Sequence, residues 1–267
     1  MVMKVLAGPW VGEFGWELMC WQAYLRSMKD VFGYDDLICF TRPGRELMYE
    51  DFAKVESFSG IPSQGADMEK MNGYSFANFL TYAKRKYEDY KIILPFHLLY
   101  HGHPVSINGS EIVAKFNPLG QDTKNSKYTV LLHARLRTHR SDKNWSMDNW
   151  KHLSDKLCSD NIDFAFVGSL KEAICPEGCN DLRGTPLRDE VGYYAGAKCL
   201  VGPMSGPMHL ATLSKCPQLV WSGDDYNEMR LKKEWNPFEV HVTYMGNNSG
   251  GWNPTVESVY NNIKKLV

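Results

Sequence analysis

The stretch that decides the fold is Lys198-Cys-Leu-Val-Gly-Pro-Met-Ser-Gly-Pro-Met-His-Leu-Ala211. It begins with Cys199 to Val201, a short apolar run of the kind that forms a buried parallel strand. The next segment, Gly202 to Gly206, holds two glycines and a proline, which break regular structure. Pro207 suits the first turn of a helix, where its missing N–H leaves no hydrogen bond unmade. The stretch therefore predicts a strand, a tight turn and a helix.

This predicted junction is a candidate anion site. Ser205 or Gly206 would be the helix N-cap, and His209 would lie in the first turn, where it could add a donor. A helix start presents unpaired backbone N–H groups and roughly half a positive charge, which together favour a phosphate. The alternative is an ordinary turn between strand and helix, with a buried histidine.

Composition sets the limits. The chain has 267 residues, is 43% hydrophobic and 23% charged, and has a net charge of −1. These values are typical of globular proteins with one large or two modest domains. The near-zero charge gives no strong attraction to nucleic acid or anionic membrane. Aromatic residues make up 13% of the chain and include 8 tryptophans, which favours stacking on sugars or bases, although most of the rings are expected in the core.

The seven cysteines are scattered, and no signal peptide precedes them, so we expect free thiols in a cytoplasmic protein. Cys175 and Cys179 lie four residues apart, but no second pair or histidine cluster completes a zinc site, which favours a structural role. No apolar run approaches the ~18 residues of a transmembrane helix. We therefore expect neither a structural metal nor a membrane segment.

The first half opens on a predicted strand, Val2 to Ala7, followed by the glycine-rich loop Gly8 to Leu18 and a helix from about Glu17 to Met28. A carboxylate in the first loop after a strand is well placed to act as a catalytic base. Glu17 and Glu13 are the two candidates, and Trp16 between them is a candidate for the acceptor side. The alternative is that both acids only favour the helix start through its dipole.

Further elements follow in the first half. We expect strands over Asp36 to Phe40 and Lys91 to Pro95, with a helix over Tyr74 to Tyr90 between them. Three histidines come next. Because no acidic partner stands at ligand spacing, a metal site is disfavoured, and we expect His97 and His101 to line a pocket for an acceptor.

The polar segment 117 to 127 contains Pro and Gly and predicts a linker. We expect an N-terminal domain over residues 1–120 and a C-terminal domain over 121–267, with the last helix, Pro254 to Val267, able to cross back. The second half then repeats the alternation of strand and helix. Its remaining predicted strands are Tyr128 to His133, Asp163 to Val167, Cys216 to Trp221 and Phe238 to Tyr244, and its remaining predicted helices are Met147 to Leu157 and Arg188 to Ala197.

The loop Ala134 to Asn144 is unusually basic and follows a predicted strand end. It contains Arg135, Arg137, His139, Arg140 and Lys143. Such a concentration of positive charge suits a bound anion, while the alternative is a solvated loop.

Strands alternating with helices on both sides of a linker predict an α/β protein with two Rossmann-like halves and parallel sheets. Ligands of such folds bind at the carboxyl ends of the strands, which here would face a cleft between the halves. The sequence has no internal repeat, no GxGxxG motif and no Walker A motif.

The second half resembles the donor-binding domain of GT-B glycosyltransferases, in particular the ADP-heptose lipopolysaccharide heptosyltransferases. Three segments are similar to family motifs, in the family's order: Lys143-Asn-Trp-Ser, Phe166-Val-Gly-Ser-Leu-Lys-Glu172 and Val201-Gly-Pro-Met-Ser-Gly-Pro-Met-His-Leu-Ala211. The third is the most specific. The resemblance covers roughly residues 128 to 222, and the first half matches less well, with Glu17 where the family has an Asp.

The resemblance implies roles for particular residues. Lys143 would hold the donor phosphates and Glu172 the nucleotide ribose, while Ser205, Gly206 and His209 would bind the diphosphate. Four more residues of these segments and of the basic loop complete the expected donor site: Arg137, Arg140, Gly168 and Met208. Met204 departs from the family, which has an Asp at that place, so the contacts of that carboxylate are missing.

The expected function is a metal-independent, inverting transfer of a sugar from a nucleotide-diphosphate donor to a hydroxyl group of a saccharide. The nucleotide sugar is a co-substrate, and no other cofactor is expected. Glu17 is expected to be the base and Glu13 a structural or acceptor-orienting group. Two alternatives remain: the same chemistry on hydroxymethylated bases of phage DNA, and a non-catalytic nucleotide- or glycan-binding module. The sugar, the nucleotide and the oligomeric state are left open.

Overall fold

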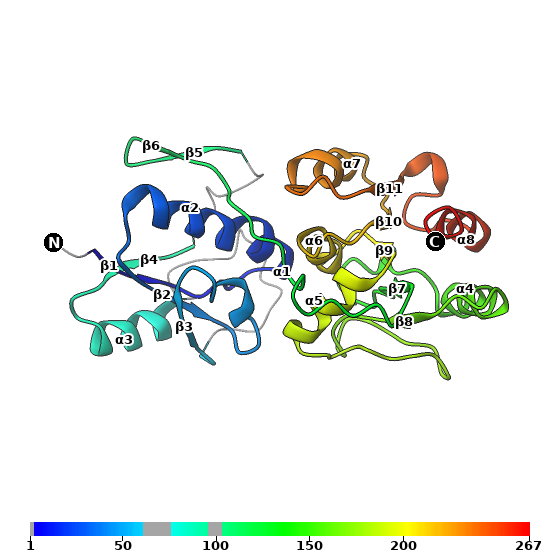
Figure 1. Ribbon diagram of the computed structural model, residues 1–267, viewed down its shortest axis with the longest axis horizontal. Helices are drawn as coiled ribbons and strands as arrows, with labels where there is room; N and C mark the ends of the chain where they lie inside the picture. Colours follow the sequence, from blue (N-terminus) through cyan, green and yellow to red (C-terminus); the bar gives the residue numbers. More distant parts are fainter. Residues whose placement is uncertain (1–2, 61–75, 96–102) are drawn as a thin grey trace. The chain divides into compact units, whose positions relative to one another are not determined.

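The computed structural model describes residues 3–60, 76–95 and 103–267, and the chain forms two compact units, Met1–Phe116 and Asn117–Val267 (Figure 1). The division falls at the start of the polar segment 117 to 127. Each unit has a parallel sheet with helices against it, as the alternation of strands and helices predicts.

The first unit contains a four-stranded parallel sheet in the order β3-β2-β1-β4. Its strands are β1 (Lys4–Ala7), β2 (Asp36–Thr41), β3 (Lys54–Ser57) and β4 (Lys91–Ile93). The central strand β1 pairs on both sides, with Val5 opposite Leu37 of β2 and Lys91 of β4. Because both faces of a parallel sheet are covered, β1 is apolar without alternation and is buried from Val5 onward.

One long helical run follows β1 and is made of α1 (Phe14–Trp16), the π-helical segment η1 (Glu17–Trp21) and α2 (Gln22–Phe32). Gly33 ends it in the left-handed conformation, with φ of 64°. Helix α3 (Ala77–Lys86) packs through Phe79 and Ala83, and Figure 1 shows α2 and α3 on opposite faces of the sheet.

Two features of the first unit were not predicted. Strand β3 extends the sheet, and the turn before it holds the short 3-10 helix η2 (Glu46–Met48). An antiparallel hairpin joins β5 (Val105–Ile107) to β6 (Ser110–Ile112). Its turn is Asn108-Gly109, with φ of 49° and 79°, and Asn-Gly is a strong signal for a tight hairpin turn.

The second unit contains a five-stranded parallel sheet in the order β11-β10-β9-β7-β8. Its strands are β7 (Val130–Leu132), β8 (Phe164–Phe166), β9 (Cys199–Pro203), β10 (Gln218–Trp221) and β11 (Val242–Met245). All five were predicted, β7 to β10 with ends that differ by at most two residues and β11 with a start shifted by four.

Helices cover both faces of this sheet (Figure 1). On one face α4 (Met147–Ser159) packs against α8 (Val256–Ile263), and on the other lie α5 (Leu187–Gly196) and α6 (Gly206–Leu213). The short helix α7 (Tyr226–Met229), the π-helical segment η6 (Arg230–Glu234) and two 3-10 turns, η5 (Ser141–Lys143) and η7 (Asn247–Ser249), complete the unit.

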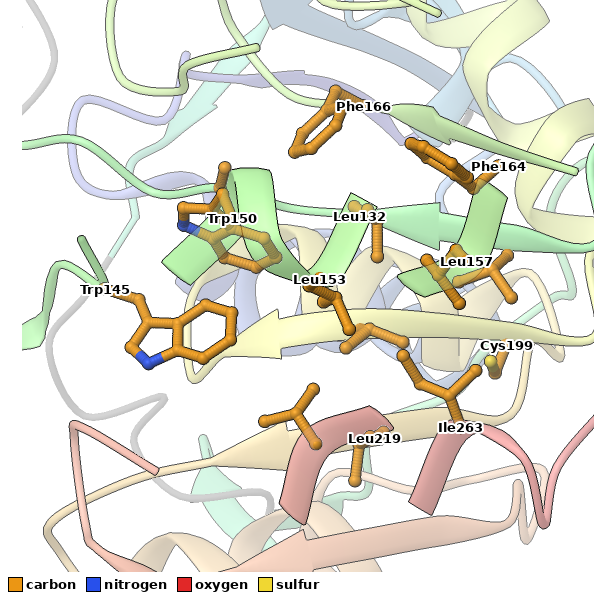
Figure 2. Close-up of a cluster of buried hydrophobic side chains, with 14 of the residues drawn as sticks. Leu132, Trp145, Trp150, Leu153, Leu157, Phe164, Phe166, Cys199, Leu219 and Ile263 are labelled. Atoms are coloured by element: carbon orange, nitrogen blue, oxygen red, sulfur yellow. The ribbon is translucent and has the colours of Figure 1, made fainter. Parts of the chain in front are cut away.

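The main core of the second unit lies between the sheet and α4 and α8 (Figure 2). Trp150, Leu153 and Leu157 line one side of α4, at the spacing of a helix face. Val259 and Ile263 of α8 are fully buried in the same core, so the apolar face of the last helix is covered within its own unit.

Candidate functional site

The strand order sets the geometry of the candidate site. Because β10, β9 and β7 are adjacent and parallel, the loops at their carboxyl ends emerge side by side. These loops are the turn that starts α6, the basic loop after β7 and the loop after β10. Two of the three are the segments that the sequence singles out, and the carboxyl edge is where α/β folds bind ligands.

The first loop is the junction between β9 and α6, and it matches the predicted strand, turn and helix. Ser205 is the N-cap residue, with an extended backbone, but its hydroxyl donates to the carbonyl of Pro203 at 3.0 Å and caps no helix N–H. Ser205 and Gly206 are partly exposed. The start of α6 therefore presents backbone N–H groups that no side chain of the N-cap satisfies.

His209 lies in the first turn of α6, where it is only 4% exposed. Its ring packs edge-on against Trp235, with centroids 4.7 Å apart, and among the described residues its Nδ1 has no hydrogen-bond partner. Burial, with a smaller effect from Arg230, lowers the pKa of His209 to about 3, so the imidazole is neutral at physiological pH. A buried, unpartnered polar atom marks a position that a ligand or water completes.

Met208 differs from the expectation that it binds donor. It is fully buried, and its methyl group lies so near Gly202 that a Cβ there would come within 3.0 Å of it. The side chain points into the packing between β9 and α6, because successive residues of a helix start face different sides. Met208 therefore supports the junction from beneath.

The basic loop after β7 is organised from inside by Arg135, which is 4% exposed. Its guanidinium donates to the carbonyls of His139 and Arg140, both at 3.0 Å, and to the side-chain oxygen of Asn144. Asn144 in turn donates to the carbonyl of Arg137 at 2.8 Å. These hydrogen bonds thus hold the loop in a defined conformation, and it is not a solvated loop without internal contacts.

Two expected donor-binding residues of this loop, Arg137 and Arg140, each lie near a carboxylate. Arg137 Nε lies 3.2 Å from Glu172 Oε1, and the backbone of Leu136 donates to the carbonyl of Glu172 at 2.8 Å. Arg140 is exposed and lies 3.4 Å from Asp142. The resemblance assigned Glu172 to a ribose, and its carboxylate stands at the same edge as the start of α6.

Lys143 ends the loop and is partly buried. Its ammonium group lies 4.3 Å from the ring centroid of Trp252. Burial lowers the pKa of Lys143, and the nearby charges of Arg140 and Arg135 lower it further. A bound anion would oppose both effects, because a nearby negative charge favours the charged form of an amine.

Gly168 follows β8 at the same edge and has φ of 119°, which favours glycine. A Cβ there would lie 2.9 Å from Nδ1 of His133, so no larger residue fits without a shift. Its backbone is held by Glu190 of α5, which hydrogen bonds to Gly168 and accepts from the hydroxyl of Tyr194 at 3.1 Å. Burial raises the pKa of Glu190 to about 7 in spite of these hydrogen bonds.

In the first unit the structure corrects the expectation for Glu17. Its side chain is fully buried, forms an ion pair with Arg45 and accepts hydrogen bonds from the hydroxyls of Tyr49, at 2.9 Å, and Thr41, at 3.4 Å. The guanidinium of Arg45 also lies 4.7 Å from the ring centroid of Phe14. A carboxylate enclosed by this network holds the helix start against the loop after β2, and it is not placed to reach a substrate hydroxyl.

Glu13 and Trp16 lie nearer the surface, and both are partly exposed. Glu13 is the N-cap residue of α1, and its carbonyl accepts from the indole N–H of Trp10 at 2.8 Å. The loop that carries Glu13 stands at the carboxyl end of β1. His97 and His101, expected on the acceptor side, lie outside the described residues.

Within residues 3–60, 76–95 and 103–267, no group of three or more His, Cys, Asp and Glu side chains is arranged to hold a metal ion. Across the same residues, no helix has both the length and the apolar character that a membrane span requires.

The sequence alone did not indicate several of the residues that shape these loops in either unit. Arg45 and Tyr49 come from a turn that carries no motif, and Glu190 lies on a helix face that reads as polar. Trp252 stands between glycines and asparagines, where an aromatic residue in a polar loop was the one available signal.

No protein-family model matches the sequence, and no curated protein matches it. Solved structures are similar over nearly the whole chain. The ADP-heptose lipopolysaccharide heptosyltransferase II of E. coli matches with a TM-score of 0.64 and 13% identity, covering 99% of this chain and 98% of that one. The E. coli heptosyltransferase WaaC, solved with ADP, matches with a TM-score of 0.60 and 15% identity, covering 99% and 100%.

A third similar structure is the glycosyl transferase family 9 protein of Veillonella parvula, with a TM-score of 0.60 and 9% identity, covering 100% of this chain and 96% of that one. These similarities extend through both units, each of which has a parallel sheet with helices against it. The chain therefore has the GT-B fold of these glycosyltransferases, with two Rossmann-like halves.

Proposed function

We propose that the protein is a metal-independent, inverting glycosyltransferase that moves a sugar from a nucleotide-diphosphate donor to a hydroxyl group of a saccharide. The observation that carries this proposal is the carboxyl edge of the second sheet. There the start of α6, with the unpartnered Nδ1 of His209, emerges between the loop of Lys143 and the loop after β10. The heptosyltransferase WaaC, which has the same fold, was solved with ADP.

This edge suits a diphosphate leaving group. As the bond between the anomeric carbon and the phosphate oxygen breaks, its electron pair stays on the diphosphate, where negative charge develops. The N–H groups at the start of α6 and the ammonium group of Lys143 would stabilise that charge, and His209, neutral at physiological pH, would donate a hydrogen bond. With these groups the leaving group needs no metal ion.

The acceptor hydroxyl needs a base. Because Glu17 is buried and Glu13 is partly exposed, we assign this role to Glu13. The hydroxyl proton would pass to the Glu13 carboxylate while the acceptor oxygen bonds to the anomeric carbon. One displacement with one base inverts that carbon, whereas retention by double displacement requires a second carboxylate as nucleophile. The free thiols of the chain, Cys20 among them, favour the cytoplasm as the place of this reaction.

A second candidate is a non-catalytic module that binds nucleotides or glycans. Met204 favours it, because this partly buried side chain stands in the turn before α6 where a carboxylate was expected from the resemblance. A protein that binds donor but releases no nucleoside diphosphate, with or without acceptor, would support this candidate.

The test is calorimetry with ADP, UDP and GDP, followed by release of nucleoside diphosphate from the matching sugar donors. We expect one nucleotide to bind without metal and in the presence of EDTA. Lys143→Met should weaken that binding by about 1.5–3 kcal/mol, the range for a hydrogen bond to a charged group. Lys151→Met, at an exposed position of α4, is the control. Binding that is unchanged in Lys143→Met, or absent in the unaltered protein, would reject the proposal.

The acceptor is tested in the same preparation. A saccharide acceptor should give turnover that depends weakly on salt. Turnover on hydroxymethylated duplex DNA, with binding that falls steeply as salt rises, would instead assign the DNA-modifying alternative.

A further inference from the structure

Trp252 differs from most tryptophans of the chain. Six of the eight are almost completely buried: Trp10, Trp21, Trp145, Trp150, Trp221 and Trp235. Trp252 and Trp16 are the two that stay partly exposed. Core packing therefore explains the positions of the other tryptophans of the second unit, but it does not explain the position of Trp252.

The ammonium group of Lys143 lies over the ring of Trp252, 4.3 Å from the ring centroid. Within the described residues, no carboxylate lies within ion-pair distance of Lys143. Arg140 and Arg135 repel the ammonium group, and Asp142 and Asp224 attract it from farther away. The indole ring thus attracts the ammonium group at contact distance without forming an ion pair with it.

The position of Trp252 depends on a close approach of two loops. A Cβ on Gly223, in the loop after β10, would lie 2.4 Å from Cδ1 and 2.5 Å from Nε1 of Trp252, so the indole occupies the space that any larger residue would need. Gly251, just before the tryptophan, has φ of 59° and lies against the same glycine. The loop is tied down further by Asn247, whose side chain donates to Asp225 at 3.3 Å.

A hydrogen bond also joins the segment of Lys143 to the segment of Trp252. The indole N–H of Trp145 donates to the carbonyl of Pro254 at 2.9 Å, and this bond is buried. Trp145 is two residues after Lys143, and Pro254 is two residues after Trp252. The hydrogen bond therefore fixes the register between the segment that carries the lysine and the segment that carries the ring.

We propose that Trp252 is a positioning residue that holds the ammonium group of Lys143 at the carboxyl edge of the sheet, ready for the diphosphate of a donor. A ring suits this task better than a carboxylate. It attracts a cation through its quadrupole but adds no net negative charge, so it does not repel an incoming diphosphate. The proposal rests on the proposed function, because the diphosphate is the ligand that Lys143 is held for.

A double-mutant cycle tests it, with ADP and UDP as probes and the dissociation constant as the readout. Trp252→Leu should weaken binding of the preferred nucleotide roughly three- to tenfold, the range expected for a cation–π contact. In a Lys143→Met background the same change should have no effect, because Trp252 acts through the lysine. Trp252→Phe keeps a ring and should recover most of the affinity. Tyr260→Leu, which removes a cation–π contact with Lys156 elsewhere in the unit, is the control.

Three results would overturn the proposal. An equal loss in the Lys143→Met background would mean that Trp252 contacts the nucleotide directly or supports the fold. Unchanged affinity in Trp252→Leu would mean that the ring does not position the lysine. If Trp252→Leu does not fold, the cycle is run with Trp252→Phe, and a loss that persists without Lys143 again rejects the proposal.

The proposed function can fail separately. If the unaltered protein binds no nucleotide, the proposed function is rejected, and the cycle is then measured by thermal unfolding. Non-additive shifts in melting temperature for Lys143→Met and Trp252→Leu would still support the contact that positions the lysine, while additive shifts would reject it.

Discussion

Single residues in the first unit show how burial decides between a catalytic and a structural carboxylate. Glu17 and Glu13 are one helical turn apart, and the backbone N–H of Glu17 donates to the carbonyl of Glu13 at 3.3 Å. Glu17 is fully buried with Arg45 and Tyr49, whereas Glu13 is partly exposed. Burial raises the pKa of the Tyr49 hydroxyl well above its usual value, and the neighbouring Glu17 carboxylate raises it further. The network therefore combines the ion pair of Glu17 and Arg45 with a phenol that keeps its proton.

We predict that Glu17→Gln lowers the free energy of unfolding by about 3–5 kcal/mol, because it leaves the charge of Arg45 buried without a partner. Glu13→Gln should keep the stability but lower turnover by roughly 10²–10⁴-fold, the usual loss for a general base. Urea unfolding and initial rates at saturating donor and acceptor measure the two effects. Glu88→Gln, at an exposed position, is the control for both.

One outcome would contradict the assignment of Glu13 as the base. A stable Glu17→Gln protein without turnover, beside an active Glu13→Gln protein, would return the base to Glu17. It would also mean that the network around Arg45 opens during the reaction.

Among the elements of structure, segment 117–127, which was predicted to be a linker, packs against helices of the second unit. Asn125 donates from its backbone to the carbonyl of Gly192 at 2.9 Å, and Leu119 donates to that of Leu213 at 2.8 Å. A Cβ on Gly192 would lie 2.3 Å from the carbonyl oxygen of Thr123. The segment thus lies along α5 and α6 of its own unit, and glycines on α5 make the close approach.

We predict that Gly196→Ala destabilises the second unit. Its Cβ would lie 2.0 Å from the carbonyl oxygen of Asn125, so the segment must move away from α5. Overpacking of this kind costs about 1–3 kcal/mol, more than the roughly 1 kcal/mol that alanine gains over glycine inside a helix. Thermal unfolding and proteolysis within residues 117–127 measure the effect, with Ala195→Ser on the same turn as the control. A Gly196→Ala protein that is as stable as the original, with the segment still protected, would contradict this docking.

At the scale of the whole molecule, three titratable groups of the second unit contribute to the pH dependence of stability. Burial lowers the pKa of His133 to about 4 and that of His209 to about 3. Because the unfolded histidines bind protons below about 6.5, their contribution to stability is present above pH 6.5 and is lost as pH falls through the lower values. Glu190 has the opposite sign, because burial raises its pKa to about 7.

We predict that Glu190→Gln removes a loss of stability with rising pH. Between the usual carboxyl value of 4.5 and about 7 the folded protein keeps a proton on Glu190 that the unfolded chain releases, so stability falls as pH rises. The two proteins should be equally stable below pH 4.5, and above pH 7 the variant should be more stable by about 3 kcal/mol. Unfolding free energies from pH 4 to 8 check this, with Glu177→Gln as the control. A constant difference across this range would show that Glu190 does not titrate there.

Much of the second unit could be predicted because its signals are local. Some local patterns predict the same structure whatever their tertiary surroundings. Examples are a short apolar run that is buried on both faces and a turn rich in glycine and proline. The β9–α6 junction and α4 were therefore predicted from the sequence. The hairpin of β5 and β6 was missed although Asn108-Gly109 signals its turn. Strand β3 was missed because its pattern of partly buried residues differs little from a loop.

The amino-acid sequence is sufficient to predict the alternation of strands and helices, and the basic loop and helix start that together predict an anion site. Which of these groups are buried depends on contacts between segments that are distant in the sequence. Glu17 is buried by Arg45, 28 residues away, and Lys143 meets Trp252 from a distant loop. Local propensity depends on neighbours in the chain, whereas burial, charge pairing and pKa depend on neighbours in space. That is why the sequence indicates the chemistry of this edge, while the fold selects the residues that can perform it.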